Sequence, residues 1–472
     1  MLVLKAESET ILSVSSQLGA MKQLLVDAQA VYRAEGLQSL LTKAVRTVLE
    51  PFVGADGARR VYHDLNRVLT YRSVAAPTFD VPQNAINIHP DGFHTFFGFY
   101  DHTPFCHENR RVLFHRIQAP MTPASRSRPI ELWYYDLEEH SATQLGESDT
   151  WNWQKGCRLR WHPTAPDTVV YNTLVDSGYG AVFHDVSDGE VTRRFRAPIY
   201  DVDQSGRYAL SINFSRLERL HFDYGYTNLS DETEGERVPE DDGIYRLDLE
   251  TGRQKLLFSY ADLASAVETP PSVEPYAMNL MISPDGKRFC FLYRYHEDGV
   301  RVTKLACATM DGNTLRVLQD DAEASHPAWR SETELLCTVN HWGAERKTEY
   351  VLFDVESSES TVIRHAELDV DTHPSFSPVD TDLFVGDTYP DHCGERHLYL
   401  YSISEGCYDS IGTVYGPVKH GIKRDFHPRW DREGKYVCVD APQPQYSQSV
   451  LVVDVEQRST QLARANDTEG GE

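Results

Sequence analysis

Seven copies of one short pattern run through residues 95–440 of the chain. Each copy has an apolar landmark, a residue four positions later that is usually a turn former, and then an apolar strand. The landmarks are Phe105, Trp161, Val202, Ile282, Trp329, Phe376 and Trp430. Seven β-units of this size predict an all-β fold, a seven-bladed β-propeller whose inner strands line a central channel. Equivalent positions of the seven repeats should therefore meet in one ring.

The repeat also predicts how the chain is divided. We expect a helical N-terminal extension at 1–78, the propeller at 79–465 and a disordered tail at 466–472. The expected blades span 95–145, 150–197, 198–260, 274–321, 324–366, 369–421 and 422–460. Apolar residues recur at helical spacing in the extension, so its helices pack on the propeller or on a second copy of the chain, giving a homo-oligomer. Lys43 and Arg46 are too few basic residues to favour a membrane-surface helix instead.

Composition excludes several classes of partner. The formal charge is −25, from 71 acidic and 46 basic residues, so nucleic acid and anionic membranes are poor partners. The first residues lack the features of a signal peptide, and no apolar run is long enough for a transmembrane helix. No Cys-x-x-Cys pair occurs, and Cys290, Cys337 and Cys438 each follow a landmark by eight residues, as small buried strand residues would. These features predict a reduced, cytoplasmic protein without structural disulfides.

The strongest chemical signal lies three residues before each landmark. The residues at this ring position are His102, Arg158, Ile199, Asn279, His326, His373 and His427. The last three belong to consecutive blades and share the dipeptide His-Pro, so we expect their imidazoles to bind one divalent metal, with Asn279 adding an oxygen. Mn²⁺ is the expected ion, with Zn²⁺ and Fe²⁺ as alternatives, and Asp371 and Asp425 are candidate outer partners of the ligands. The histidines could instead be structural strand starts, as His162-Pro163 suggests, or could bind an anion without metal.

A second cluster surrounds the third blade. Tyr200 starts an inner strand, and the next strand is expected to continue from Ala209 through Leu217, which would bring Arg216 to the same channel mouth as Tyr200. His102 would join them from the first blade. Removing a proton α to a carboxylate needs a cation to neutralise the carboxylate, a base to take the proton and an acid for the leaving oxygen. Tyr200 and His102 are the expected acid–base pair, and Arg216 the carboxylate clamp.

Substrate-binding residues are expected around the same mouth. Aromatic rings there could stack on sugar rings, and polar residues of the second blade could add hydrogen bonds. The expected residues are Tyr100, Trp153, Gln154, Arg158, Tyr224 and Tyr226.

At these residues the chain resembles the propeller polysaccharide lyases, the oligogalacturonate lyase and ulvan lyase group. The resemblance spans about 95–460 in architecture and rests on His102, on Tyr200 with Arg216 sixteen residues later, and on the His-Pro blade starts. It implies acid–base catalysis by a tyrosine and a histidine, an arginine that neutralises a uronate and a metal bound by histidines. The second blade departs from the pattern because it has Gln154 and Arg158 where a second histidine is expected. TolB-type propellers, which are often scaffolds, are a weaker resemblance.

Three functions are consistent with these features. The first is a metal-dependent lyase that cleaves uronate-containing oligosaccharides by β-elimination. The second is a non-catalytic propeller that binds an acidic glycan or a protein partner. The third is a metal-dependent hydrolase using carboxylates such as Asp101, Asp387 or Asp391. Fold alone does not choose among them.

Overall fold

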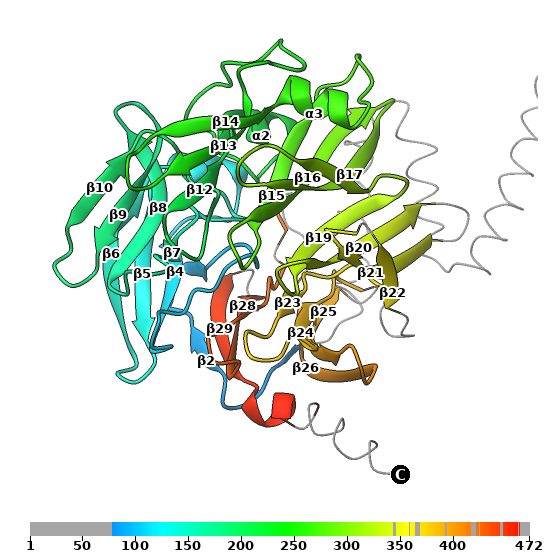
Figure 1. Cartoon of the computed structure of the whole chain (residues 1–472). Helices are drawn as coiled ribbons and strands as arrows, with labels where there is room; N and C mark the ends of the chain where they lie inside the picture. Colours follow the sequence, from blue (N-terminus) through cyan, green and yellow to red (C-terminus); the bar gives the residue numbers. More distant parts are fainter. Residues whose placement is uncertain are drawn as a thin grey trace, which may run out of the picture. The chain divides into compact units, whose positions relative to one another are not determined.

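The computed structural model describes residues 78–462, apart from short gaps at 343–345, 358, 364–368, 392–393, 417–421, 424, 444–446 and 461. Seven antiparallel sheets surround a central channel, which confirms the predicted seven-bladed propeller (Figure 1). The helices predicted at the N-terminus and the tail predicted at the C-terminus lie outside the described residues. Within the described part of the chain, no helix is long and apolar enough to cross a membrane.

The blades follow one another along the chain, each running from an inner strand to an outer one. The first four are β3 (His94–Phe96), β4 (Arg111–Ile117), β5 (Ile130–Asp136) and β6 (Ser141–Ser148); β7 (Arg160–Trp161), β8 (Thr168–Val175), β9 (Gly178–Asp185) and β10 (Val191–Phe195); β11 (Asp201–Val202), β12 (Tyr208–Ser211), β13 (Gly243–Asp248) and β14 (Gln254–Ser259); and β15 (Tyr276–Ile282), β16 (Arg288–Glu297), β17 (Val300–Thr309) and β18 (Leu315–Gln319). The last three are β19 (Glu323–Trp329), β20 (Glu334–Trp342), β21 (Arg346–Asp354) and β22 (Ser360–Ile363); β23 (Ser375–Phe376), β24 (Leu383–Asp387), β25 (Glu395–Ser402) and β26 (Cys407–Tyr415); and β27 (Arg429–Trp430), β28 (Tyr436–Pro442) and β29 (Gln448–Asp454).

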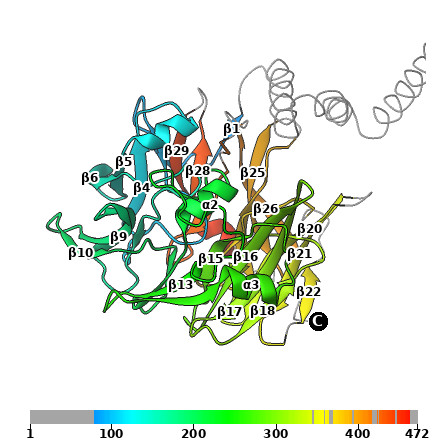
Figure 2. The same ribbon diagram turned by 90° about the horizontal axis from the view of Figure 1, so that it is seen from above.

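Strands from the beginning of the propeller complete its last two blades. β2 (Ile86–Ile88) pairs with β29 and forms the outer strand of the seventh blade, with Ile86 opposite Val452. β1 (Phe79–Asp80) pairs with β26 and adds a fifth strand to the sixth blade. In the view of Figure 2, β1 lies near β25 and β26, and β29 lies near β4. The ring is thus closed by strand pairing between residues more than 300 positions apart in sequence.

The repeat is explained by two kinds of contact. The residue eight positions after each landmark is completely buried in all seven blades: Leu113, Val169, Leu210, Cys290, Cys337, Phe384 and Cys438. The tryptophan landmarks join neighbouring blades, because each indole N–H donates to a backbone carbonyl of the preceding blade: Trp161 to Pro104 at 2.9 Å, Trp329 to Met281 at 3.0 Å and Trp430 to Ser375 at 2.8 Å. The described cysteines are all free, and six of the seven are buried.

Three short helices lie between strands in the described part of the chain: η1 (Pro123–Ser127), α2 (Phe214–Leu220) and α3 (Tyr260–Ala266). The prediction that the strand after Tyr200 continues through Leu217 was wrong, because β12 ends at Ser211 and α2 begins at Phe214. Asn213 is the cause, since its side-chain oxygen accepts the backbone N–H of Arg216 at 3.0 Å and caps the helix. Arg216 therefore lies on a helix rather than on a strand.

Candidate metal centre and active site

The ring position has an unusual backbone in several blades. Arg158, Asn279, His326 and His427 all have positive φ, between 47° and 59°, although none is glycine. In β15 and β19 the strand register shifts on either side of this position, as in a β-bulge. Bulges re-aim side chains, and the left-handed backbone costs about 1–2 kcal/mol at each non-glycine residue. The fold thus maintains local strain at the residues that the sequence pattern singled out.

The three His-Pro imidazoles lie together. The ring centroids of His326 and His373 are 4.0 Å apart, and those of His373 and His427 are 4.5 Å apart. Each of the three side chains is at most 5% exposed. The equivalence of blades inferred from the sequence therefore holds for these side chains.

A possible metal-binding group forms around two of these histidines. Ligand atoms of His373, Asp425 and His427 all lie within 4.8 Å of one another. Nε2 of His427 and Oδ2 of Asp425 are buried and find no hydrogen-bond partner among the described residues. Leaving buried polar atoms unpaired costs about 1–3 kcal/mol each, so a cation between them would satisfy both. Two imidazoles and a carboxylate fit a divalent transition metal.

Neighbouring side chains orient this group for such an ion. Asp387 accepts from Nδ1 of His373 at 2.8 Å, which leaves Nε2 of that ring free to bind. A carboxylate on the far nitrogen of a histidine is the usual outer partner in metal sites. Burial, then His373 and Arg429, lower the pKa of His427 and keep its imidazole neutral, as a ligand must be. Arg396 lies 3.4 Å from Asp425 and balances part of its charge.

His326 stands beside the group rather than within it. Its Nδ1 pairs with Asp371 at 3.0 Å, and its Nε2 lies 3.5 Å from the hydroxyl of Tyr389. Asp371 therefore orients His326, one of the three histidines for which the sequence suggested it as an outer partner. Asp425, expected to be an outer partner, instead contributes an atom to the group itself.

A cavity of about 510 Å³ opens on the histidine side of the channel. Cationic side chains from several blades line it, in a protein with a formal charge of −25. Its lining includes His221, Tyr224, Asn279, Arg294, His326 and Tyr389. His326 and Tyr389 both contact His373, with ring centroids 4.0 and 5.6 Å away, so the candidate metal group adjoins this cavity.

Arg294 is the cation best placed to receive an anion. It projects from β16, is only 5% exposed, and has Nη1 3.1 Å from the sulfur of Met278. Among the described residues, its Nε is buried without a hydrogen-bond partner, and no carboxylate lies within ion-pair distance of its guanidinium. Arg301, also in the lining, is different because Glu323 already binds it, with 2.9 Å between Nε and Oε1. A signal for Arg294 was present in the sequence, since it interrupts the apolar run Phe289–Tyr293.

His221 lies at the same cavity, just after α2. The hydroxyl of Tyr276 is 3.0 Å from its Nδ1, and the ring of Tyr224 packs 4.5 Å away between centroids. Burial, followed by Arg294 and other nearby cations, lowers the pKa of His221 well below its usual value. The imidazole is therefore neutral at neutral pH and able to accept a proton.

The expected catalytic trio does not share one cavity. Tyr200 is fully buried, and its hydroxyl accepts from the backbone N–H of Asn279 at 2.7 Å and from the ammonium of Lys155. Burial raises the pKa of Tyr200. The hydroxyl lines neither cavity, so it is poorly placed to exchange a proton with a substrate.

Arg216 also lies away from both cavities. Its guanidinium donates to the backbone carbonyls of Arg237 at 2.7 Å and Pro275 at 3.1 Å, and to the hydroxyl of Thr233 at 3.0 Å. It thereby joins α2 to the loop that contains Thr233 and Arg237, between α2 and β13, and to Pro275 just before β15. Its donors are occupied by the protein itself.

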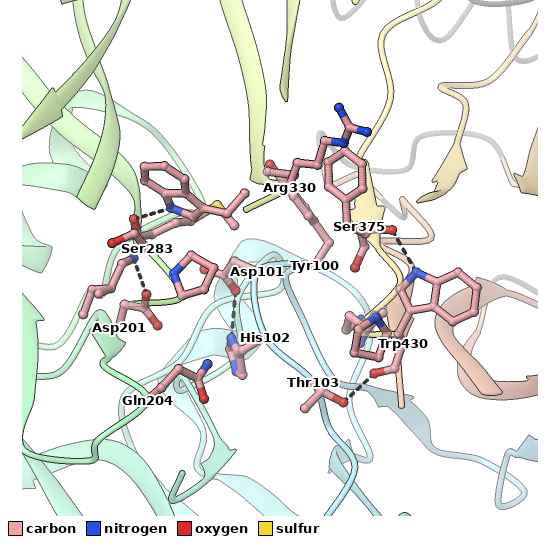
Figure 3. Close-up of a pocket in the computed structure, with 18 of the residues that line it drawn as sticks. Tyr100, Asp101, His102, Thr103, Asp201, Gln204, Ser283, Arg330, Ser375 and Trp430 are labelled. Atoms are coloured by element: carbon pink, nitrogen blue, oxygen red, sulfur yellow. Dashed lines mark hydrogen bonds and ion pairs between the residues drawn. The ribbon is translucent and has the colours of Figure 1, made fainter. Parts of the chain in front are cut away.

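His102 lines a second cavity, of about 920 Å³, at the landmark end of the channel (Figure 3). Its Nδ1 lies 2.8 Å from Asp101 and its Nε2 lies 3.1 Å from the carbonyl of Leu159. Burial, followed by Arg160, lowers the pKa of His102 to about 3. Tyr100 lines this cavity while its ring packs 6.1 Å from that of His326, so the segment around Tyr100 lies between the two cavities.

This segment is held rigidly across the channel. The backbone N–H groups of Phe97 and Gly98 both donate to Asp440, at 2.8 Å each. Gly98 has φ of 123°, and a Cβ at that position would lie 2.8 Å from the backbone of Lys155, so only glycine fits.

The expected substrate-binding residues are dispersed. Tyr224 lines the histidine-side cavity and Tyr100 the opposite one. Trp153, Gln154 and Tyr226 line neither and are at most 3% exposed. Arg158, likewise buried, forms an ion pair with Asp101 at 2.7 Å.

Comparison with known proteins gives a fold relationship. No family model and no curated protein sequence matches the chain. Among solved structures, an oligogalacturonate lyase in complex with manganese aligns over 80% of this chain and 96% of its own, with a TM-score of 0.58 and 16% identity. The oligogalacturonate lyase of Vibrio parahaemolyticus aligns over 80% and 97%, with a TM-score of 0.56 and 13% identity.

The chain has the fold of the oligogalacturonate lyases. The alignments cover nearly the whole of both lyases, so the seven-bladed architecture is shared throughout. TolB of Acinetobacter baumannii is also similar, with a TM-score of 0.35 over 77% of this chain and 15% identity.

Proposed function

We propose that this protein is a metal-dependent lyase that cleaves uronate-containing oligosaccharides by β-elimination. One observation carries the proposal: the buried guanidinium of Arg294, which has no ion-pair partner among the described residues, lines the same cavity as the neutral imidazole of His221. The adjoining group of His373, Asp425 and His427 supports a divalent cation. The fold shared with a manganese-containing oligogalacturonate lyase favours the same class of substrate and Mn²⁺ as the ion.

The proposed reaction assigns a task to each residue. Arg294 binds the uronate carboxylate and neutralises its charge, which makes the neighbouring C–H bond more acidic. The Nδ1–H group of His221 donates a hydrogen bond to the hydroxyl of Tyr276. Nε2 of the same ring is then unprotonated and takes the C–H proton of the substrate. The C–H electron pair forms the ring double bond, the C–O bond to the leaving sugar breaks, and the leaving oxygen takes a proton from Tyr389.

Tyr389 is suited to the role of acid. Burial, then Asp425 and Asp371, raise its pKa well above the usual value, so its hydroxyl stays protonated. A divalent cation held by His373, Asp425 and His427 would supply fixed positive charge that stabilises the enolate-like intermediate. In this proposal His221 and Tyr389 are the base and the acid, in place of Tyr200 and His102. Arg294 replaces Arg216 as the residue that binds the carboxylate.

The product of β-elimination provides the test. The unsaturated sugar absorbs ultraviolet light where the intact sugar does not. We expect this absorbance to rise when the Mn²⁺-loaded protein meets uronate oligomers, among pectic, ulvan-like and glycosaminoglycan fragments. His221→Gln should lower kcat by about 10²- to 10⁴-fold, the usual contribution of a general base. Tyr200→Phe should change kcat little, because its buried hydroxyl lines neither cavity and reaches the site only through Asn279.

Absence of product with every oligomer would overturn the lyase assignment. Calorimetric binding of the same oligomers by that inactive protein would identify it as a non-catalytic glycan-binding propeller. The two outcomes use the same preparation and are therefore directly comparable.

The pH dependence of the reaction should reflect the buried position of His221. A base works in its deprotonated form, and burial lowers the pKa of His221. We therefore expect kcat/KM to stay high as pH falls through 6.5, the usual value for histidine, and to drop only at more acidic pH. Measuring metal content at each pH separates this effect from loss of the ion. A midpoint at or above 6.5 would argue against His221 as the base.

A further inference from the structure

Lys155 is a buried cation that the proposed reaction does not use. It is 2% exposed, and no carboxylate of the described residues lies within ion-pair distance of its amine. Its ammonium donates to the hydroxyl of Tyr200 and, at 2.8 Å, to Oδ1 of Asn279. It also lies 3.9 Å from the ring centroid of Phe99, where a cation–π contact stabilises it. Burial lowers the pKa of Lys155 well below its usual value.

The contact with Lys155 determines which way the amide of Asn279 faces. The amine of Lys155 donates to the carbonyl oxygen of the amide, so the NH₂ group of the amide faces away from Lys155. Asn279 lines the histidine-side cavity, and the structure records no partner for its Nδ2 among the described residues. The NH₂ group is therefore a donor available to the cavity.

The backbone of Asn279 is fixed as well. Its N–H donates to Tyr200 at 2.7 Å, and its φ of 51° places it in the left-handed region within the bulge of β15. Two contacts, one to the backbone and one to the side chain, thus hold this residue in a single orientation. Its oxygen is already engaged, which opposes the earlier expectation that Asn279 is a metal ligand.

We infer that Asn279 is a substrate-recognition residue whose NH₂ group donates to a carboxylate or hydroxyl oxygen of the sugar, and that Lys155 is the positioning residue that orients it. This inference rests on the proposed lyase function. Lys155 contacts no substrate and acts through Asn279 alone. The donor complements Arg294 of the same cavity, so the site would recognise a sugar oxygen by charge and by hydrogen bonding together.

The test measures KM, kcat and Mn²⁺ affinity in four variants. Asn279→Ala removes the donor. Asn279→Asp keeps an oxygen toward Lys155 but presents a second acceptor to the cavity. Lys155→Met removes the hydrogen-bond donor that orients the amide, and Asn313→Ala, in the exposed turn between β17 and β18, is the control. We expect both Asn279 variants to raise KM by about 10-fold or more, with smaller effects on kcat, as loss of a hydrogen bond to a charged group predicts.

Lys155→Met should also raise KM, and Asn313→Ala should leave KM, kcat and Mn²⁺ affinity unchanged. Mn²⁺ affinity should be unchanged in every Asn279 variant. A fall of 10-fold or more in Mn²⁺ affinity in the Asn279 variants would make the residue a metal ligand and overturn the inference. An unchanged KM in both variants would also overturn it.

Calorimetric binding of an uncleaved uronate trimer separates this inference from the function on which it rests. If the wild-type protein binds the trimer without cleaving it, and the Asn279 variants bind it about 10-fold more weakly, recognition by Asn279 stands while the lyase assignment fails. If the wild-type protein cleaves uronates and the variants bind and cleave them equally well, the assignment stands and the inference fails. Absence of any trimer binding by the wild-type protein would overturn both.

Discussion

Replacing His373 and His427 together with alanine will remove the bound divalent cation and lower kcat/KM for uronate cleavage by about 10³-fold or more. The two residues supply two of the three ligand groups that converge within 4.8 Å. A metal ion contributes several kcal/mol of transition-state stabilisation, and each 1.36 kcal/mol corresponds to about tenfold in rate. The metal content of protein purified without an affinity tag, measured by elemental analysis, should fall from about one ion per chain to none.

Single variants distinguish the two ligand sets that this chain could use. Asp425→Asn should weaken Mn²⁺ binding strongly, because it removes the only carboxylate of the group formed with His373 and His427. His326→Ala should leave the ion in place, since His326 pairs with Asp371 and lies outside that group. The opposite pattern would restore the three-histidine site expected from the sequence.

His162→Ala is the matched control for these variants. His162 is also followed by proline, like the three ring histidines, but it comes one residue after a landmark instead of three residues before one. In the structure, its Nδ1 accepts the backbone N–H of Ala165 at 3.1 Å and supports a turn. We expect its loss to leave metal content and kcat unchanged. Metal loss in this control would show that any change in a His-Pro pair disturbs the ion indirectly.

The propeller could be predicted because its determinants are repeated seven times. An apolar landmark and a buried residue eight positions later satisfy the same packing demand in every blade, so the pattern stands out without knowledge of the loops. The ring position followed from the same symmetry, which is why His326, His373 and His427 were expected to meet and do. Repetition turns a long-range contact into a local pattern.

The residues proposed for catalysis could not be predicted in the same way, because they do not follow the repeat. Arg216 was assigned to a strand, but the cap provided by Asn213 starts a helix there, which turns its guanidinium toward backbone carbonyls. His221 reaches the cavity because it follows that helix. A single side chain, Asn213, therefore decides which residue of this segment is available for chemistry.

Tyr200 shows a different limit. Its position at the start of an inner strand was predicted correctly, but the sequence did not reveal that Lys155 would donate a hydrogen bond to its buried hydroxyl. Lys155 belongs to a loop of the second blade and comes into contact only through the three-dimensional fold. A repeat pattern cannot predict that a loop residue outside the repeat will bury a side chain. It can reveal a charged residue within an apolar strand, such as Arg294.

Replacing Arg294 with methionine will lower kcat/KM for a uronate oligomer by about 10²- to 10³-fold, the usual cost of losing a preorganised donor to a developing anion. Arg294→Lys should recover only part of this loss, because an ammonium cannot reproduce the two parallel hydrogen bonds of a guanidinium to a carboxylate. Arg288→Met on the same strand, whose side chain pairs with Glu356 at the surface, should retain full activity. Metal content should be unchanged in all three variants.

A chemically modified substrate makes the role of Arg294 specific. When the uronate carboxyl group is a methyl ester, its charge is already neutralised, so the cation has less to contribute. We therefore expect the defect of Arg294→Met to shrink by at least about tenfold on the ester relative to the free acid, because charge neutralisation is the part of its effect that the ester already supplies. An equal defect on both substrates would mean that Arg294 only maintains the shape of the cavity. The ratio of the two defects measures charge neutralisation directly, since any general damage to the fold lowers both rates alike.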